Sequence, residues 1–270
     1  MQEIRLPTWE AFGEHVSTLE ASRARTKGER QTHVSEILYR GQARSSWSLV
    51  TTLERSAGKD VRLSEYYGLI FGIKPEIEAF TSRRWEIPEP QEYDQHLQRR
   101  KIPPGITQAV YEYMSHLRHH GFPSPLLDWT TSPYIAAFFA FKDATDEREA
   151  VAIYAYLEYA GHGKAGWVNE PRITGLGPTV RTHARHFLQK CQYTICTRRD
   201  GADEWYSSHE LAFARDDKGQ DLLWKFIIPA SERQKVLRLL ERFNITAFSL
   251  FGSEESLMES LSLREFLMKE

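Results

Sequence analysis

Hydrophobic positions in the first half of the chain recur with a helical period. Residues 8–24 have an amphipathic pattern, and residues 64–80 indicate a second helix. Over residues 106–120 the apolar side chains fall on one face, and Gly121 with Pro123 supplies the stop. The polar stretch SRARTKGERQT, which follows the first helix, is predicted to be an exposed, mobile loop.

The second half has a different pattern, because its apolar runs are rich in β-branched and aromatic residues. AVAIYAYL, QYTICT, LLWKFIIP and TAFSLF are predicted to be strands, as is the earlier EILYRGQ. Between LLWKFIIP and TAFSLF, the segment SERQKVLRLLERF predicts a helix that opens with a capping box, Ser231 to Gln234. The chain is thus predicted to be α+β, with early helices and a mixed, mostly antiparallel late sheet.

We expect one domain, because no internal repeat or low-complexity linker divides the chain. Its predicted parts are an N-terminal helix and exposed loop at 1–35, a core at 36–251 and a C-terminal helix at 252–270. With 270 residues, of which 41% are hydrophobic and 12% aromatic, the chain has the material for a sizeable core.

The sequence predicts no association with a membrane. No stretch approaches 18 uninterrupted apolar residues, and MQEIRLPTWEAF lacks the basic-then-apolar layout of a secretory signal. We therefore expect a soluble, cytoplasmic protein. Cys191 and Cys196 are five residues apart in a predicted strand, so their side chains should point to opposite faces. This spacing disfavours a disulfide or a metal site between them.

The net charge of −2 argues against a uniformly basic nucleic-acid binder, yet the charge is unevenly distributed. From Lys164 to Arg199 there are seven Lys and Arg residues and one acidic residue, Glu170. This segment is either a solvated face balanced by acids elsewhere in the fold or a surface that binds phosphates. For the second alternative, the candidate nucleic-acid-binding residues are Arg181, Arg185, Lys190, Arg198 and Arg199.

A polar turn leads directly into an apolar run in HHGFPSPLLDWTTSPYIAAFFAF, residues 119–141. LLDW is predicted to be a short buried strand, and Pro133 suits the first position of a helix capped by Ser132 or Thr131. YIAAFFAF should be a core helix, because it is hydrophobic on all sides. A helix N-terminus among hydroxyls can bind an anion or a sugar. Alternatively, the hydroxyls only cap the helix, and Asp128 only satisfies nearby N–H groups.

Three segments resemble the FRG-domain family: LYRGQARSSWSLVTTLER, RHHGFPSPLLDWTTSPYIAAFFAF and RHFLQKCQYTI. The resemblance runs from about residue 10 to about residue 250. The matching positions are Tyr39, Arg40, Gly41, Gln42, Trp47, Leu49, Leu53, Arg55, His119, Gly121, Pro123, Leu126, Leu127, Asp128, Trp129, Thr130, Ser132, Pro133, Ala136, Phe139, Arg185, Gln189 and Tyr193. The chain departs from the family at the name-giving Phe, which is Tyr39, at Ser124 and Pro125, and at Cys191, where a glycine is frequent.

A more distant resemblance is to ADP-ribosyltransferases that use an Arg, a Ser-Thr-Ser motif and a Glu. Arg40 matches the arginine, Thr130-Thr131-Ser132 matches the triplet, and Gln189 falls near the expected glutamate. This resemblance implies an ADP-ribosyltransferase-like fold with NAD as co-substrate and no metal. His119-His120 and the His183/His186 pair also lack a carboxylate or Cys at ligand spacing.

Cleavage of the nicotinamide–ribose bond of NAD develops positive charge on the sugar. The enzyme must therefore anchor the pyrophosphate and stabilise an oxocarbenium-like transition state. The candidate NAD-binding residues are Arg40, Gly41, Gln42, His119, Thr130 and Ser132. Among these, Arg40 is expected to pair bidentately with the phosphates. The candidate catalytic residues are Asp128, the one carboxylate in the motif, and Gln189, which cannot supply negative charge or act as a general base.

The resemblances imply an ADP-ribosyltransferase that modifies a macromolecule, with nucleic acid, such as RNA, favoured over protein as the acceptor. Such an enzyme would suit a bacterial toxin or antiphage defence effector, and a toxin would have a neutralising antitoxin. One alternative is an NAD glycohydrolase, in which water replaces the acceptor. Another is a non-catalytic nucleotide-sensing or interaction module, which the missing motif glutamate favours. No GxxxxGK[ST] motif is present, so P-loop chemistry is disfavoured.

Overall fold

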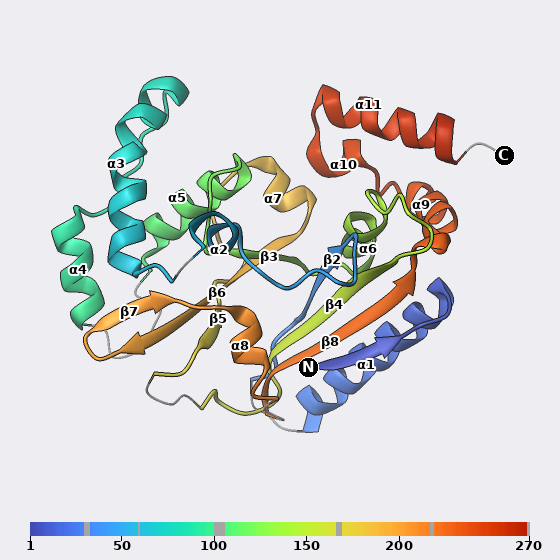
Figure 1. Cartoon of the computed structure of the whole chain (residues 1–270), viewed down its shortest axis with the longest axis horizontal. Coiled ribbons are helices and arrows are strands. Elements are labelled where there is room, and N and C mark those ends of the chain that lie inside the picture. Colours follow the sequence, from blue (N-terminus) through green and yellow to red (C-terminus); the bar gives the residue numbers. More distant parts are fainter. Residues whose placement is uncertain (30–32, 59, 100–105, 166–168, 217–218, 269–270) are drawn as a thin grey trace.

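A computed structural model describes the chain except for residues 30–32, 59, 100–105, 166–168, 217–218 and 269–270. Its centre is an eight-stranded sheet with the order β1-β8-β4-β2-β3-β6-β5, in which β7 also pairs with β6 (Figure 1). The strands are β1 (Gln2–Arg5), β2 (Ile37–Gln42), β3 (Leu127–Thr130), β4 (Ala150–Tyr159), β5 (Arg172–Gly175), β6 (Cys191–Asp200), β7 (Asp203–Tyr206) and β8 (Gln220–Pro229). The β1·β8 pair is parallel and the other described pairs are antiparallel, which confirms the predicted α+β fold with a mixed, mostly antiparallel sheet.

Helices cover both ends of this sheet. They are α1 (Trp9–Glu29), α2 (Thr52–Ala57), α3 (Leu63–Thr81), α4 (Pro90–Arg99), α5 (Gln108–His119), α6 (Pro133–Phe141), α7 (Ala184–Leu188), α8 (His209–Phe213), α9 (Arg233–Arg242), α10 (Ala247–Phe251) and α11 (Glu254–Ser262), with shorter turns at η1 (Ala230–Glu232) and η2 (Leu263–Leu267). In Figure 1, α3, α4 and α5 lie at one end, and α1, α9, α10 and α11 lie at the other. In the described part of the chain, no helix combines the length and hydrophobicity that a membrane span requires.

The sheet is buried on both faces, which agrees with the predicted apolar strands. Successive side chains of β2 alternate between faces: Tyr39 packs in a cluster with α1, α6 and α9, whereas Leu38 packs in another with α8. The predicted core helix is confirmed, because most of the side chains of α6 are buried. Cys191 and Cys196, both free thiols, lie in different clusters, as their odd spacing predicted.

The predicted loop after the first helix is wrong for residues 22–29, because α1 continues to Glu29. Arg23 stabilises this extension: its Nε donates to the main-chain oxygen of Ser35 at 2.6 Å, and its Nη1 lies 3.7 Å from Glu20 Oε2, one turn earlier. The end of the helix is thereby attached to the segment that enters β2. The rest of the predicted loop, residues 30–32, lies outside the described residues.

Two predictions for the C-terminal part are also wrong. TAFSLF forms α10 instead of a strand, because Thr246 and Ser249 make a reciprocal capping box and Gly252 ends the helix in a left-handed conformation. The predicted capping box from Ser231 to Gln234 does not form, because Ser231 lies in the turn η1 and α9 begins at Arg233. Glu232, the residue before α9, accepts a hydrogen bond from the main-chain nitrogen of Trp9 instead.

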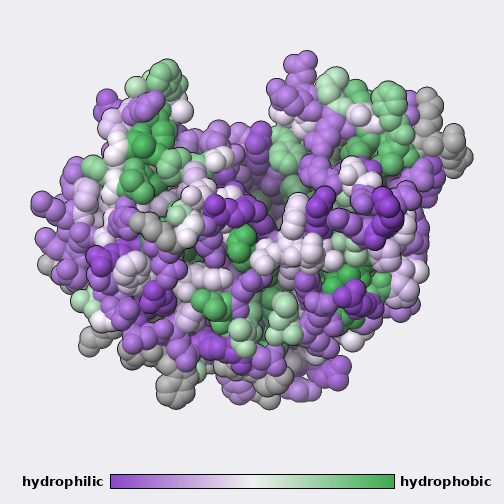
Figure 2. Space-filling view, viewed as in Figure 1, coloured by the Kyte–Doolittle hydropathy of each residue, from purple (hydrophilic) through white to green (hydrophobic). Residues whose placement is uncertain are grey.

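Exposed hydrophobic side chains gather at two projections of the molecule. Leu69 and Phe80 on α3 are 57% and 85% exposed, and Phe248 on α10 and Met258 on α11 are about half exposed. Figure 2 shows hydrophobic surface at the tip of α3 and over α10 and α11, on either side of a notch in the outline.

Candidate functional site

The junction of β2, β3 and α6 brings the sequence motifs together. Tyr39 on β2 lies opposite Thr130 on β3, and Thr130 lies opposite Cys191 on β6. Gly41 lies directly against α6, where a Cβ atom would be 1.9 Å from the main-chain oxygen of Ala136. The absence of a side chain at this position therefore allows β2 and α6 to pack closely.

The hydroxyl groups after β3 have structural hydrogen bonds. Ser132 caps α6, because its Oγ accepts from the main-chain nitrogen of Ile135 at 3.3 Å, as the sequence predicted. Thr130 Oγ1 accepts from the main-chain nitrogen of Ser132 at 3.1 Å and donates to the main-chain oxygen of Gln189 at 2.7 Å. Thr130 thus joins the start of α6 to the turn between α7 and β6.

A cavity of about 380 Å³ opens beside this junction, within the range of about 300–1,000 Å³ typical of ligand pockets. It is lined by Tyr39, Arg40, Gly41, Gln42, Ala43, Trp47, Arg55, Arg118, His119, Asp128, Trp129, Thr130, Ala136, Phe139, Asp143, Arg185, Gln189, Cys191 and Phe251. The structure thus brings together the predicted catalytic and NAD-binding residues with the exception of Ser132, which caps the adjacent helix.

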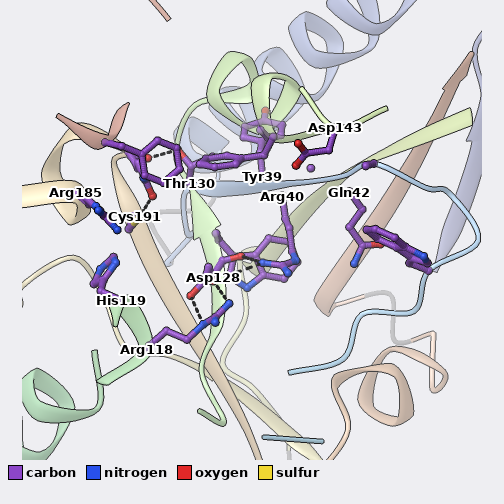
Figure 3. Close-up of a pocket in the computed structure, with 18 of the residues that line it drawn as sticks. Tyr39, Arg40, Gln42, Arg118, His119, Asp128, Thr130, Asp143, Arg185 and Cys191 are labelled. Atoms are coloured by element: carbon purple, nitrogen blue, oxygen red, sulfur yellow. Dashed lines mark hydrogen bonds and ion pairs between the residues drawn. The ribbon is translucent and has the colours of Figure 1, made fainter. Parts of the chain in front are cut away.

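Asp128 lies between two arginines in this cavity (Figure 3). Arg118, at the end of α5, donates from Nε to Oδ1 at 3.1 Å and from Nη2 to Oδ2. Arg40 Nη1 donates to the main-chain oxygen of Asp128 at 2.8 Å and lies 3.9 Å from Oδ2. Asp128 raises the pKa of Arg118, whereas burial lowers the pKa of Arg40. One carboxylate is therefore held by two cations.

Sequence reasoning missed Arg118, Arg55, Trp47 and Asp143 as cavity residues. Arg118 is the first residue of the RHHGF stretch, so its place next to the motif was the available signal. The contact of Arg118 with Asp128 depends on the fold, because the chain reverses direction at Gly121, after α5, and so brings Arg118 next to β3.

Two neutral groups, His119 and Cys191, lie near Arg185 at one end of the view in Figure 3. His119 Nε2 lies 2.7 Å from the hydroxyl of Tyr193, and burial lowers the pKa of His119 to about 4. Burial also raises the pKa of the Cys191 thiol to about 12. His119 and Cys191 are therefore uncharged at neutral pH, and Arg185 carries the charge at this end of the cavity.

Gln189 has hydrogen-bond partners at both ends of its amide. Its Nε2 donates to the main-chain oxygen of Leu250 at 3.1 Å, and its Oε1 lies 3.6 Å from the Cys191 sulfur as acceptor. Its main-chain nitrogen donates to the main-chain oxygen of Arg185 at 2.9 Å. Gln189 therefore attaches the turn after α7 to α10, in addition to lining the cavity.

Gln42 and Asp143 lie at the opposite end of the view from Arg185 (Figure 3). Gln42 Nε2 donates to the main-chain oxygen of Ser48 at 3.2 Å, and its Oε1 is buried without a hydrogen-bond partner among the described residues. Asp143 lies 3.0 Å from the ammonium group of its neighbour Lys142. The acid at this end of the cavity is therefore already paired.

The five candidate nucleic-acid-binding residues do not form one surface. Arg185 lies on α7, with Arg181 before this helix and Lys190 after it, and of the three Arg185 lines the cavity. Arg198 and Arg199 lie at the far end of β6, roughly 25 Å along the strand from Cys191 at about 3.3 Å per residue. There Arg198 Nη2 is 2.8 Å from Asp60, and Arg199 is paired in register with Glu204.

A site for a metal ion is not visible in the described ranges, which contain no group of three or more His, Cys, Asp or Glu side chains arranged to hold one.

Comparison with known families gives one match. The family model of the FRG domain matches residues 35–149. Searches among curated proteins and solved structures found no match. The matched segment contains Arg40, Arg118, Asp128 and α6, while Arg185 and Gln189 lie beyond it. The chain therefore contains an FRG domain at residues 35–149.

Proposed function

We propose that this chain is an NAD-dependent ADP-ribosyltransferase that modifies a macromolecule. The observation that carries this proposal is the composition of the cavity: four arginines (Arg40, Arg55, Arg118 and Arg185) line it together with Asp128 on β3. Cations suit the diphosphate of NAD, and a carboxylate held in place suits the positive charge that develops on its ribose. Both requirements of the reaction are thus represented in one cavity.

The proposed reaction exchanges one bond at C1′ of the nicotinamide ribose. The bond from C1′ to the nicotinamide nitrogen breaks, and its electron pair remains on that nitrogen, which loses its positive charge. A nucleophilic oxygen or nitrogen of the acceptor bonds to C1′ and releases its proton to solvent. Asp128 supplies negative charge near the cationic sugar, and Arg118 fixes the orientation of that carboxylate.

Nucleic acid is the proposed acceptor, with protein as the alternative. Arg181 and Lys190 are exposed next to α7, whose Arg185 lines the cavity. These cations would attract a phosphate backbone to the cavity. The proposed biological role is that of a toxin or antiphage effector, with a protein antitoxin as its partner. If water reaches C1′ in place of the acceptor, the same cavity would act as an NAD glycohydrolase.

A second candidate function is a nucleotide-sensing module without turnover. The observation that favours it is the full engagement of Asp128, because Arg118 bonds both carboxylate oxygens and Arg40 lies 3.9 Å from one of them. Two cations reduce the negative potential that this carboxylate presents to the cavity. In addition, the amide of Gln189 cannot replace a catalytic glutamate. This candidate predicts NAD binding without release of nicotinamide.

The test is to incubate the purified chain with NAD labelled in the adenylate phosphate, with separate pools of RNA, DNA and protein. A transferase places the label on one pool and releases one nicotinamide for each ADP-ribosyl group transferred. A glycohydrolase gives free ADP-ribose, and a sensing module gives binding alone. Asp128→Asn is the matched inactive variant, because it keeps the side-chain shape and removes the charge. No release of nicotinamide with any pool would exclude the two enzymatic functions.

A further inference from the structure

We propose that Arg185, assisted by Arg55, binds the diphosphate of the nucleotide, and that Arg40 positions Asp128 instead. The proposal rests on the proposed function, which identifies the ligand as a dinucleotide. The charges in the cavity favour an anionic ligand, and the diphosphate ester follows from the proposed function. The four cavity arginines differ in whether they are free to bind an anion.

Arg40 and Arg118 are occupied within the protein. Arg118 bonds both carboxylate oxygens of Asp128, and Arg40 bonds the main-chain oxygen of the same residue. Releasing either arginine to a ligand would break a partly buried hydrogen bond and leave Asp128 short of a partner. These two arginines therefore serve the protein's own carboxylate.

Arg55 and Arg185 have no carboxylate partner in the described part of the chain. Arg185 is partly buried, its Nε lacks any hydrogen-bond partner there, and its guanidinium lies 5.4 Å from the Phe251 ring centroid. A partly desolvated guanidinium without an anion is unfavourable unless a ligand supplies one. The packing on Phe251 also orients the planar group, as bidentate binding of phosphate requires.

The surroundings of Arg185 contain no competing anion within ion-pair distance in the described part of the chain. His119 and Cys191 are uncharged, and Asp128 is engaged by Arg118. Glu255 is exposed on α11, and Arg185 makes a small contribution to the lowering of the pKa of Glu255. The two residues do not form an ion pair. Arg185 and Arg55 both line the cavity and are thus the two cavity arginines available to the two negative charges of a diphosphate ester.

Arg185 is held in place before a ligand arrives. Gln189 donates from its main chain to Arg185 and from its side chain to Leu250, and Thr130 donates to the main-chain oxygen of Gln189. The short helix α7 is thus attached both to β3 and to α10. The side-chain polar groups of Gln189 and Thr130 are thus used in hydrogen bonds within the protein, although both residues line the cavity. We therefore assign them as positioning residues for Arg185.

The test measures binding of inorganic pyrophosphate, ADP-ribose and nicotinamide to the full chain by calorimetry. Arg185→Gln should weaken pyrophosphate and ADP-ribose binding by about 10- to 100-fold, because a charge-assisted contact of about 1.5–3 kcal/mol is lost. Nicotinamide binding should be unchanged. Arg55→Gln should give a smaller loss, because this side chain is exposed. Arg84→Gln, at an exposed arginine outside the cavity, is the matched control and should change binding less than twofold.

Arg185→Lys keeps the charge without the planar fork and should retain part of the affinity, which also covers the case in which Arg185→Gln does not fold. The proposal is overturned if pyrophosphate does not bind the unaltered chain, or if folded Arg185→Gln binds it as tightly. NAD turnover with an unchanged KM in Arg185→Gln would likewise overturn it while leaving the proposed function intact. Conversely, Arg185-dependent binding without nicotinamide release would support this proposal and exclude the enzymatic functions.

Discussion

Arg118 bonds both carboxylate oxygens of Asp128, with 3.1 Å between Nε and Oδ1 and a second contact from Nη2 to Oδ2. The two residues are ten apart in sequence, on α5 and β3, and the turn at Gly121 brings them together. The pair fixes the carboxylate in one orientation within the cavity. Removing the charge of this carboxylate is therefore the most direct test of the proposed reaction.

Asp128→Asn should reduce nicotinamide release by at least about 100-fold, the effect expected when one preorganised electrostatic group is removed from a transition state. The KM for NAD should change less, because the residues proposed to bind the diphosphate are Arg185 and Arg55. Asp143→Asn, at the other acid of the same cavity, is the control and should retain activity. Equal losses in the two variants would show that general cavity charge, and not Asp128, supports turnover.

Gly41→Ala should destabilise the fold by about 1–3 kcal/mol or more, because a Cβ at this position would lie 1.9 Å from Ala136 O. Gly13→Ala is the matched control: Gly13 lies in α1, and a Cβ added there would meet no atom within 4 Å beyond its chain neighbours and the backbone of its own helix. That change should stabilise the helix by about 0.5–1 kcal/mol. Urea unfolding of both variants measures the difference. A stable Gly41→Ala protein would mean that β2 and α6 separate at little cost.

The sequence predicted much of this site because its signals are local. Pro133 after Ser132 marked the start of α6, and the apolar run after it marked burial. The Arg118 contact was not predictable, because it depends on how α5 folds back onto β3. TAFSLF was assigned to the wrong class because a short apolar run is too brief to distinguish a helical from a strand period. Arg198 and Arg199 were grouped with Arg185 by sequence distance, although an extended strand carries them far from it.

Acid should destabilise the protein in part through His209, which is fully buried and whose pKa burial lowers to about 3. In the unfolded chain this histidine binds a proton below about pH 6.5, whereas in the folded protein it stays neutral until about pH 3. The free energy of unfolding should therefore fall as the pH drops below about 6.5, by up to about 1.4 kcal/mol per pH unit from this group.

His209→Gln removes that dependence. At pH 8 the variant should be less stable than the unaltered chain, because the 2.9 Å contact between His209 Nε2 and Thr194 Oγ1 is lost. At pH 5 the difference should narrow, since the unaltered chain then loses stability that the variant does not. Urea unfolding at about pH 8, 6.5 and 5 measures this narrowing, and a constant difference would show that His209 does not contribute to the acid sensitivity.

Transfer to nucleic acid should depend on the cations around α7 and not on those at the far end of β6. Arg181→Gln with Lys190→Gln should reduce transfer, whereas Arg198→Gln with Arg199→Gln should have a smaller effect, because those arginines face acids about 25 Å along the strand from Cys191. Polyanion binding releases counterions, so transfer should fall steeply between about 50 and 200 mM salt. Cleavage of NAD by water should fall much less, because a dinucleotide makes few ion pairs. Two results would contradict this prediction: no transfer to nucleic acid, or transfer that responds to salt and to both double variants in the same way as NAD cleavage. In either case the cations near α7 are a solvated face, and the acceptor is a protein.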